Sequence, residues 1–134
     1  MLPNTYRLLL VEDNPADARM VQLALEEVAS AHFDIVNAVS LDGALMALND
    51  GSFDAVLLDL SLPDAMGLEA LERVQKRVPS VPVVVFSGNH DEELAVEAVH
   101  QGAQDYLVKG HGDGHVITRV VRYAKERKRS EDMM

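Results

Sequence analysis

The chain contains no cysteine and no tryptophan, and only 4% of its 134 residues are aromatic. The absence of cysteine excludes a disulfide framework and a thiolate metal site. No apolar run approaches the roughly 20 residues of a membrane span, and no signal-peptide pattern opens the sequence. With an ordinary fraction of apolar and charged residues, these absences predict one soluble globular domain. We expect a cytoplasmic location and no insertion into a membrane.

Basic residues are scarce too, because 12 lysines and arginines stand against 22 aspartates and glutamates and leave a net charge of −10. This excess argues against direct nucleic-acid binding by the body of the domain. The segment 119–134 differs from the rest, since it holds six basic and three acidic side chains. We expect this segment to be the solvated, charged end of a helix.

Apolar runs alternate with helical patterns along the chain. The run 55–58 shows no polar alternation, which predicts a strand buried on both faces, as in a parallel sheet covered by helices. Similar runs and the helical patterns between them predict a doubly wound α/β sandwich with five strands and five helices. The expected strands cover residues 6–11, 33–39, 55–58, 83–86 and 106–108.

Several residues predict where the helices begin and end. Asn14 and Ser40 are suited to N-caps. The end of the second helix at Gly51 is expected to be left-handed, and Gly102 is expected to close the fourth helix. In the last helix the apolar residues recur at helical spacing. That spacing predicts outward-facing side chains for Arg119, Arg122 and Lys125.

Four of the five expected strands end in a charged or reactive group. Because parallel strands end along one edge of a sheet, these groups should lie together there. The second strand ends without such a group, which suits an order with strand two outside strand one and strand three on its other side. The groups at the four strand ends are Glu12 and Asp13, Asp59, Ser87, and Lys109.

Three neighbouring carboxylates raise one another's pKa values, so the expected cluster of Glu12, Asp13 and Asp59 needs a compensating charge. A hard divalent cation with oxygen ligands supplies it, and magnesium suits a site with few carboxylates. Lys109 adds a fixed cation, and the Ser87 hydroxyl can donate to an oxyanion. These groups are the equipment for transferring a phosphoryl group to an aspartate.

Four segments in this order, 9–14, 57–69, 85–88 and 105–110, strongly resemble the receiver domains of two-component response regulators. The resemblance covers about residues 7–127. It implies a flavodoxin-like (βα)5 sandwich whose five-stranded parallel sheet has the order 2-1-3-4-5. It also implies a receiver domain over residues 1–129. Two arrangements stay open, a standalone receiver or one cut from a larger protein. In the second case the end of the last helix, about 125–134, is expected to be a linker to an output domain that these residues do not contain.

The resemblance also assigns roles to individual residues. Asp59 matches the phosphoacceptor, Lys109 the phosphate-pairing lysine, Ser87 the conserved hydroxyl and Tyr106 the aromatic switch residue. The ligands expected for magnesium (or manganese) are Asp13, Asp59 and the backbone carbonyl of Ser61, with Glu12 acting through water. One position departs from the family pattern, and two others leave the lifetime of the phosphoryl group open. Gly110 stands where many receivers have proline, and Ser61 and Asn89 occupy positions that tune dephosphorylation.

The function that the resemblance implies is a switch, not an enzyme, although the domain assists its own phosphoryl transfer and dephosphorylation. The donor would be a histidine kinase or phosphotransfer protein. The phosphorylated form would act on a downstream protein or output domain. A weak, phosphorylation-dependent homodimer is expected where an acidic fourth helix meets a basic fifth helix. The acidic residues are Glu92, Glu93 and Glu97, and the basic ones are Arg119, Arg122 and Lys125.

Two other functions fit less well. An aspartate-nucleophile phosphatase of the haloacid dehalogenase type needs a carboxylate two residues after the nucleophile, where Ser61 stands. A flavodoxin needs a hydroxyl- and glycine-containing phosphate loop where this chain has acidic residues. Asp64 is expected to be a turn residue. His111 and His115 have the spacing of helical metal ligands, but the glycines at 110, 112 and 114 favour exposed histidines on a flexible connection.

Overall fold

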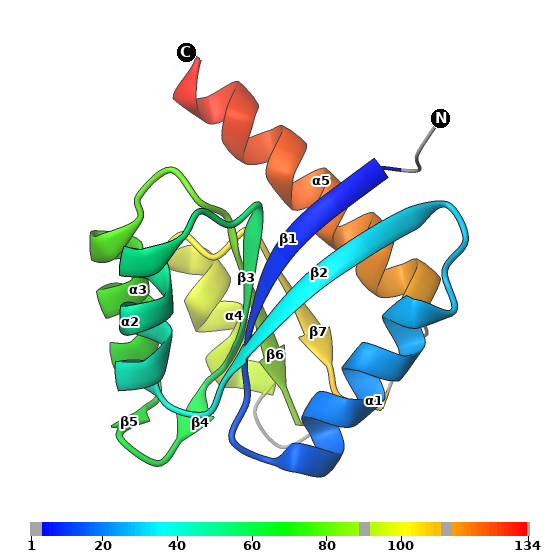
Figure 1. Cartoon of the computed structure of the whole chain (residues 1–134). Coiled ribbons are helices and arrows are strands. Elements are labelled where there is room, and N and C mark those ends of the chain that lie inside the picture. The colour runs from blue at the N-terminus through cyan, green and yellow to red at the C-terminus, as the bar shows by residue number, and fades with distance from the viewer. Residues whose placement is uncertain (1–3, 89–91, 111–113, 134) are drawn as a thin grey trace.

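The computed structural model describes residues 4–88, 92–110 and 114–133 and has a parallel sheet at its centre (Figure 1). The strands lie in the order β2 (Ala31–Ala38), β1 (Asn4–Val11), β3 (Ala55–Asp59), β6 (Val83–Ser87) and β7 (Asp105–Val108). One face of the sheet is covered by α1 (Pro15–Glu26) and α5 (Gly114–Asp132). The other face is covered by α2 (Leu41–Asp50), α3 (Glu69–Arg77) and α4 (Glu92–His100). In chain order the sheet is 2-1-3-4-5, which confirms the predicted doubly wound fold.

Alternation of side chains along each strand divides the core into two layers. On β1, Leu8 and Leu10 pack toward α1 and α5, whereas Leu9 and Val11 pack toward α2, α3 and α4. Every residue of β3 and β6 is buried. The absence of polar alternation in these strands therefore follows from helices on both faces of the sheet. Among the described helices, none is both long and apolar enough to span a membrane.

A two-stranded hairpin follows β3 and was not predicted. It consists of β4 (Ser61–Leu62) and β5 (Ala65–Met66), which pair antiparallel across a turn that contains Asp64. The prediction of a turn at Asp64 is thus confirmed, but the side chain has a further contact. Its carboxylate accepts hydrogen bonds from the backbone N–H groups of Leu41 (2.8 Å) and Asp42 (3.0 Å). The loop after Asp59 is therefore attached to the N-terminus of α2.

The predicted helix ends are confirmed with one exception. Asn14 caps α1 by accepting hydrogen bonds from the N–H groups of Ala16 and Asp17, and Ser40 caps α2. Gly102 has a φ of +114° directly after α4. The left-handed conformation predicted at Gly51 is wrong, because its φ of −158° is that of extended backbone. The chain leaves α2 by extending at once toward β3.

Gly114 has a different role from the one predicted. Gly114 is the first residue of α5, and a Cβ there would overlap the backbone carbonyl of Ala24 and lie 2.8 Å from Val28 Cγ2. Gly114 therefore allows α1 and α5 to touch and is not part of a flexible connection. His115 lies on α5 and is exposed, as expected. His111 and Gly112 lie outside the described residues.

The prediction that three basic residues of α5 all face outwards is correct only for Arg119. Lys125 forms an ion pair with Asp54 (2.7 Å) and lies over the Tyr6 ring, and Arg122 donates a hydrogen bond to the Tyr6 hydroxyl (3.3 Å). Burial by itself raises the pKa of Asp54. The Lys125 ammonium and the backbone N–H of Arg7 lower it by a larger amount, so the pKa lies below its usual value. These contacts fasten α5 to the sheet edge opposite the candidate site.

Candidate functional site

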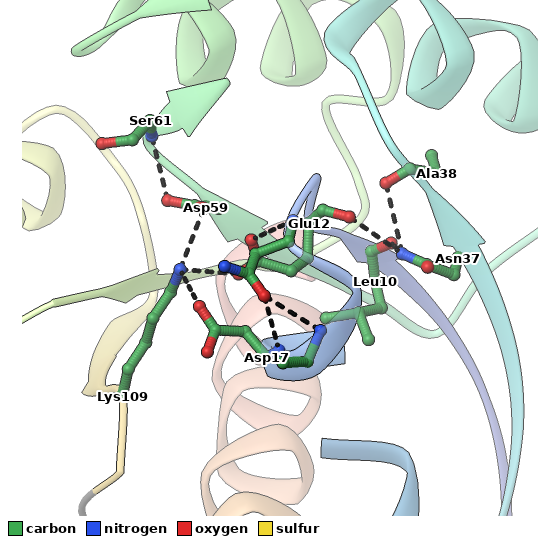
Figure 2. Close-up of polar contacts among 10 residues, drawn as sticks. Leu10, Glu12, Asp17, Asn37, Ala38, Asp59, Ser61 and Lys109 are labelled. Atoms are coloured by element: carbon green, nitrogen blue, oxygen red, sulfur yellow. Dashed lines mark hydrogen bonds and ion pairs between the residues drawn. The ribbon is translucent and has the colours of Figure 1, made fainter. Parts of the chain in front are cut away.

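Four strand ends converge at the carboxyl edge of the sheet, as predicted. Asp59 and Ser87 are the last residues of β3 and β6, and both are buried. Glu12 directly follows β1, whose Val11 is paired with Leu58 of β3, so its side chain lies next to Asp59 (Figure 2). Lys109 directly follows β7 and reaches across to both carboxylates.

The acidic cluster consists of Glu12, Asp13 and Asp59. One carboxylate oxygen from each lies within 4.8 Å of the other two. Glu12 and Asp59 are buried, whereas Asp13 is exposed. The sequence prediction that these three side chains come together is therefore confirmed, with the added result that only Asp13 faces solvent.

Several contacts fix the buried carboxylates. The Glu12 backbone N–H donates to the Ala38 carbonyl (2.9 Å), and Glu12 Oε1 accepts from the Asn14 N–H (3.1 Å). Asn37 of β2 donates its Nδ2 to the carbonyls of Leu10, Glu12 and Ala38. Asp59 Oδ1 accepts from the Ser61 N–H (2.9 Å), which restricts rotation of the Asp59 carboxylate.

Lys109 has three carboxylate neighbours. Its Nζ lies 2.7 Å from Glu12 Oε2, 3.0 Å from Asp17 Oδ2 and 3.0 Å from Asp59 Oδ2 (Figure 2). The contact with Glu12 is a close ion pair, and the contacts with Asp17 and Asp59 are also hydrogen bonds. The ammonium lies 5.4 Å from the centre of the Phe86 ring. The three carboxylates therefore hold the Lys109 ammonium next to the acidic cluster.

The electrostatics of the site follow from this burial. Desolvation is the main cause that raises the pKa of Glu12 to about 7, and the Lys109 ammonium offsets only part of it. Burial by itself lowers the pKa of Lys109, but the close contacts with the carboxylates of Glu12, Asp17 and Asp59 outweigh it and leave the pKa above its ordinary value. Lys109 is therefore a permanent cation, while Glu12 gains or loses its proton near neutral pH.

The other predicted residues lie around this centre. Ser87 is 1% exposed, and no described residue provides a hydrogen-bond partner for its hydroxyl oxygen. Tyr106 is half-buried on β7 and packs against the core layer beneath α4. Gly110 has a φ of +80°, which a proline could not adopt. Asn89 lies outside the described residues.

The donor set at this edge fits a hard divalent cation. Clustered carboxylate oxygens are the ligands that magnesium and manganese take, and Asp13 is exposed to solvent beside the two buried groups. A buried hydroxyl without a hydrogen-bond partner, such as that of Ser87, destabilises the folded state unless an acceptor binds beside it. An oxyanion bound at Asp59 would be such an acceptor.

Sequence reasoning missed three polar residues that shape the site. Asp17 was interpreted only as an acidic residue of a first helical turn, and its contact with Lys109 gave no local signal, because the two residues are 92 positions apart. Asn37 gave no local signal, because its acceptors lie on the neighbouring strand. Asp64 was correctly placed in a turn, but its contact with α2 depends on the tertiary fold.

Comparison with known proteins gives a consistent result. Residues 8–121 match the family model described as response regulator receiver domain. The KDP operon transcriptional regulatory protein KdpE of Escherichia coli is 34% identical over 113 residues, which are 84% of this chain and 48% of that protein. The two-component response regulator ORR1 of Oryza sativa subsp. japonica is 32% identical over 77% of this chain and 48% of its own length. The chain thus spans about half the length of these relatives.

Solved structures agree with the sequence relatives. The receiver domain of NtrX from Brucella abortus has a TM-score of 0.77 and 31% identity, over 89% of this chain and 98% of that one. A longer NtrX structure gives a TM-score of 0.83 at 29% identity, over 96% of this chain and 28% of that one. Domains of this kind are switches in phosphorylation-dependent signalling and not classical enzymes. From its sequence, its sheet order and the groups at its strand ends, the chain belongs to the response regulator receiver domain family.

Proposed function

We propose that this chain accepts a phosphoryl group on Asp59 from a histidine kinase or phosphotransfer protein, in a reaction that depends on magnesium or manganese. The observation that carries the proposal is the position of the Asp59 carboxylate. It is buried, lies within 4.8 Å of the oxygens of Glu12 and Asp13, and is paired with Lys109 at 3.0 Å. A carboxylate so placed is shielded from bulk water and faces a fixed cation.

The chemical step is an in-line displacement at phosphorus. An oxygen of Asp59 attacks, and a new P–O bond forms while the P–N bond of a phosphohistidine breaks, with the electron pair leaving on the imidazole. Lys109 balances charge on the phosphoryl oxygens, and the Ser87 hydroxyl donates to one of them. The metal, held by Asp13, Asp59 and the Ser61 carbonyl and reached by Glu12 through water, would neutralise the remaining charge. The same groups would assist hydrolysis of the acyl phosphate by water.

The phosphorylated state would be read through the surface formed by α4, β7 and α5. A charge-assisted hydrogen bond from Ser87 to the phosphoryl group is about twice as strong as a neutral one. Movement of Ser87 would open space for the half-buried ring of Tyr106 to turn inward. This change would alter the surface offered to a downstream protein and favour a weak homodimer.

The relatives suggest how the domain is used. KdpE is named as a transcriptional regulator, and this chain spans 48% of it. We therefore take residues 1–129 as the receiver domain and the end of α5, about 125–134, as a linker to an output domain. The cytoplasm, where a kinase would supply the phosphoryl group, is the proposed location.

Intact-mass measurement with acetyl phosphate and magnesium chloride tests the acceptor. Wild-type protein should gain one phosphoryl adduct, and Asp59→Asn or addition of EDTA should abolish it. Asp50→Asn is the matched control, since it alters an exposed aspartate at the end of α2 and should leave the adduct intact. An equal adduct on Asp59→Asn would show that another residue is the acceptor.

A further inference from the structure

We propose that Asp17 is a positioning residue for phosphoryl transfer, because it holds the Lys109 ammonium beside Asp59. This inference rests on the proposed function. Asp17 Oδ2 accepts a hydrogen bond from Lys109 Nζ at 3.0 Å, the same distance as from Nζ to Asp59 Oδ2. The contact joins the first turn of α1 to the residue after β7, which are 92 positions apart in sequence.

The geometry of an ammonium group shows why a third carboxylate matters. Lys109 has three N–H donors and no acceptor. Its three close neighbours are Glu12, Asp17 and Asp59. The flexible four-carbon stem of a lysine has a large rotamer entropy, so the ammonium stays in one place only if its contacts fix it.

Asp17 differs from the other two neighbours in its availability. The oxygens of Glu12 and Asp59 also belong to the acidic cluster that fits a cation, and Asp59 is the residue that would carry the phosphoryl group. Asp17 is not a member of that cluster. Asp17 therefore stays free to bind Lys109 when Glu12 and Asp59 interact with a cation or when Asp59 carries the phosphoryl group.

Asp17 is itself held in place. Its backbone N–H donates to the capping side chain of Asn14 (3.1 Å), within the first turn of α1. Its side chain is only 30% exposed. The backbone that carries this carboxylate is thus fixed at the helix start, and Lys109 is attached to a rigid element of the fold.

A simpler role for Asp17 is the favourable interaction of an acidic residue with the positive end of a helix. That role affects stability alone and does not require a contact with Lys109. The positioning role instead affects the rate of phosphoryl transfer and the mobility of the Lys109 ammonium. The two roles can therefore be separated by measurement.

The test compares Asp17→Ala and Asp17→Asn with wild type, and Glu26→Ala serves as a control that removes an exposed carboxylate from the other end of α1. Adduct formation with acetyl phosphate and magnesium should slow on the order of tenfold in Asp17→Ala, since misplacing a catalytic group by a small distance carries a cost of this size or larger. Asp17→Asn, which keeps the shape and one acceptor, should be intermediate. Glu26→Ala should match wild type.

Two further readouts distinguish an effect on Lys109 from an effect on the metal or on folding. Magnesium affinity, measured by calorimetry, should be unchanged, because Asp17 lies outside the acidic cluster. In the metal-free protein the Lys109 ammonium signal in nitrogen-detected NMR should broaden in Asp17→Ala, because one of its two hydrogen-bond acceptors is lost. Asp17→Asn keeps the comparison valid if the alanine variant folds poorly.

The outcomes separate this inference from the proposed function. If wild-type protein forms no adduct on Asp59, the proposed function fails. If wild type forms the adduct and both Asp17 variants form it equally fast, only the role of Asp17 is wrong. A loss of rate accompanied by a matching loss of magnesium affinity would also overturn the role, because Asp17 would then act through the metal.

Discussion

At the scale of single residues, burial distinguishes Glu12 from its neighbour in sequence, Asp13. Glu12 is 1% exposed, whereas Asp13 is exposed to solvent. Desolvation is the largest cause that raises the pKa of Glu12 from 4.5 to about 7 in the folded protein. Lys109 at 2.7 Å lowers that pKa but does not restore the ordinary value.

This raised pKa predicts how the stability of the metal-free protein depends on pH. The folded state binds the Glu12 proton more tightly than the unfolded state, so the contribution is fully present below about pH 4.5 and is lost as the pH rises through 7. At about 1.4 kcal/mol per pH unit of difference, the loss is about 3 kcal/mol. Urea unfolding of metal-free wild type and Glu12→Gln, at several pH values, should show a flatter curve for the variant between pH 5 and 8.

Asp64→Asn is the control for this titration, because it changes an exposed carboxylate whose pKa is lowered and not raised. The backbone N–H groups of Asp42 and Leu41 cause that lowering, so this variant should change the curve only in acid. If Glu12→Gln and wild type lose stability in parallel between pH 5 and 8, burial of Glu12 does not control the titration.

At the scale of elements, the contact between α1 and α5 depends on the absence of a side chain at Gly114. A Cβ there would overlap the Ala24 carbonyl, which belongs to the backbone of α1 and has no rotamer with which to move away. The two helices cover the same face of the sheet and share one core layer (Figure 1). Any added atom must therefore separate them.

Gly114→Ala is accordingly expected to destabilise the protein by about 1–3 kcal/mol, the usual range for overpacking. Thermal or urea unfolding measures the effect. Gly88→Ala is the matched control, since a Cβ at Gly88 would have no atom within 4 Å. Equal stabilities of the two variants would mean that the helices can separate without cost.

Much of the fold could be predicted because its signals are local. The apolar runs at residues 55–58 and 83–86, the caps at Asn14 and Ser40, and the groups at the strand ends each depend on near neighbours in sequence. The features that were missed depend on contacts between distant segments. Lys125 was expected to face solvent, but Asp54 lies 71 positions away and binds it. Gly114 was expected to lie in a flexible connection, because its contact with Ala24 of another helix leaves no signal in the local sequence.

The same distinction applies to the site. Its principal residues were predicted to lie together from their places after the strands, since parallel strands bring their ends to one edge. The contact of Asp17 with Lys109 and the three hydrogen bonds of Asn37 require knowledge of which side chains reach across that edge.

At the scale of the whole molecule, charge is divided between α4 and α5. Glu92, Glu93 and Glu97 are exposed on α4, beside the exposed apolar side chains of Val96 and Val99. Of the basic residues Arg119, Arg122 and Lys125 on α5, only Arg119 is fully available, because the other two have partners within the chain. The proposed homodimer therefore has fewer charges to pair, each worth about 0–1 kcal/mol.

We expect sedimentation velocity to show monomers in the absence of a phosphoryl mimic. Beryllofluoride with magnesium should produce weak association at low salt, and high salt should reverse it because exposed charges are screened. The Asp59→Asn variant should remain monomeric throughout. Association that is independent of both the mimic and salt would contradict a charge-paired, phosphorylation-dependent dimer.

The strand β7 is held by side-chain contacts at both of its ends, so it can transmit a movement from one end to the other. Lys109 follows the last residue of β7 and contacts the acidic cluster. At the start of β7, Arg127 of α5 donates to the carbonyl of Gln104 and pairs with Asp105. Gln104 also donates to Glu131, near the end of α5. Five residue steps of about 3.3 Å join Gln104 to Lys109, so one extended segment of roughly 16 Å connects the site to the far end of α5. An extended chain cannot lengthen, so a pull on Lys109 along the strand axis acts on the terminal turns of α5 without passing through a loop.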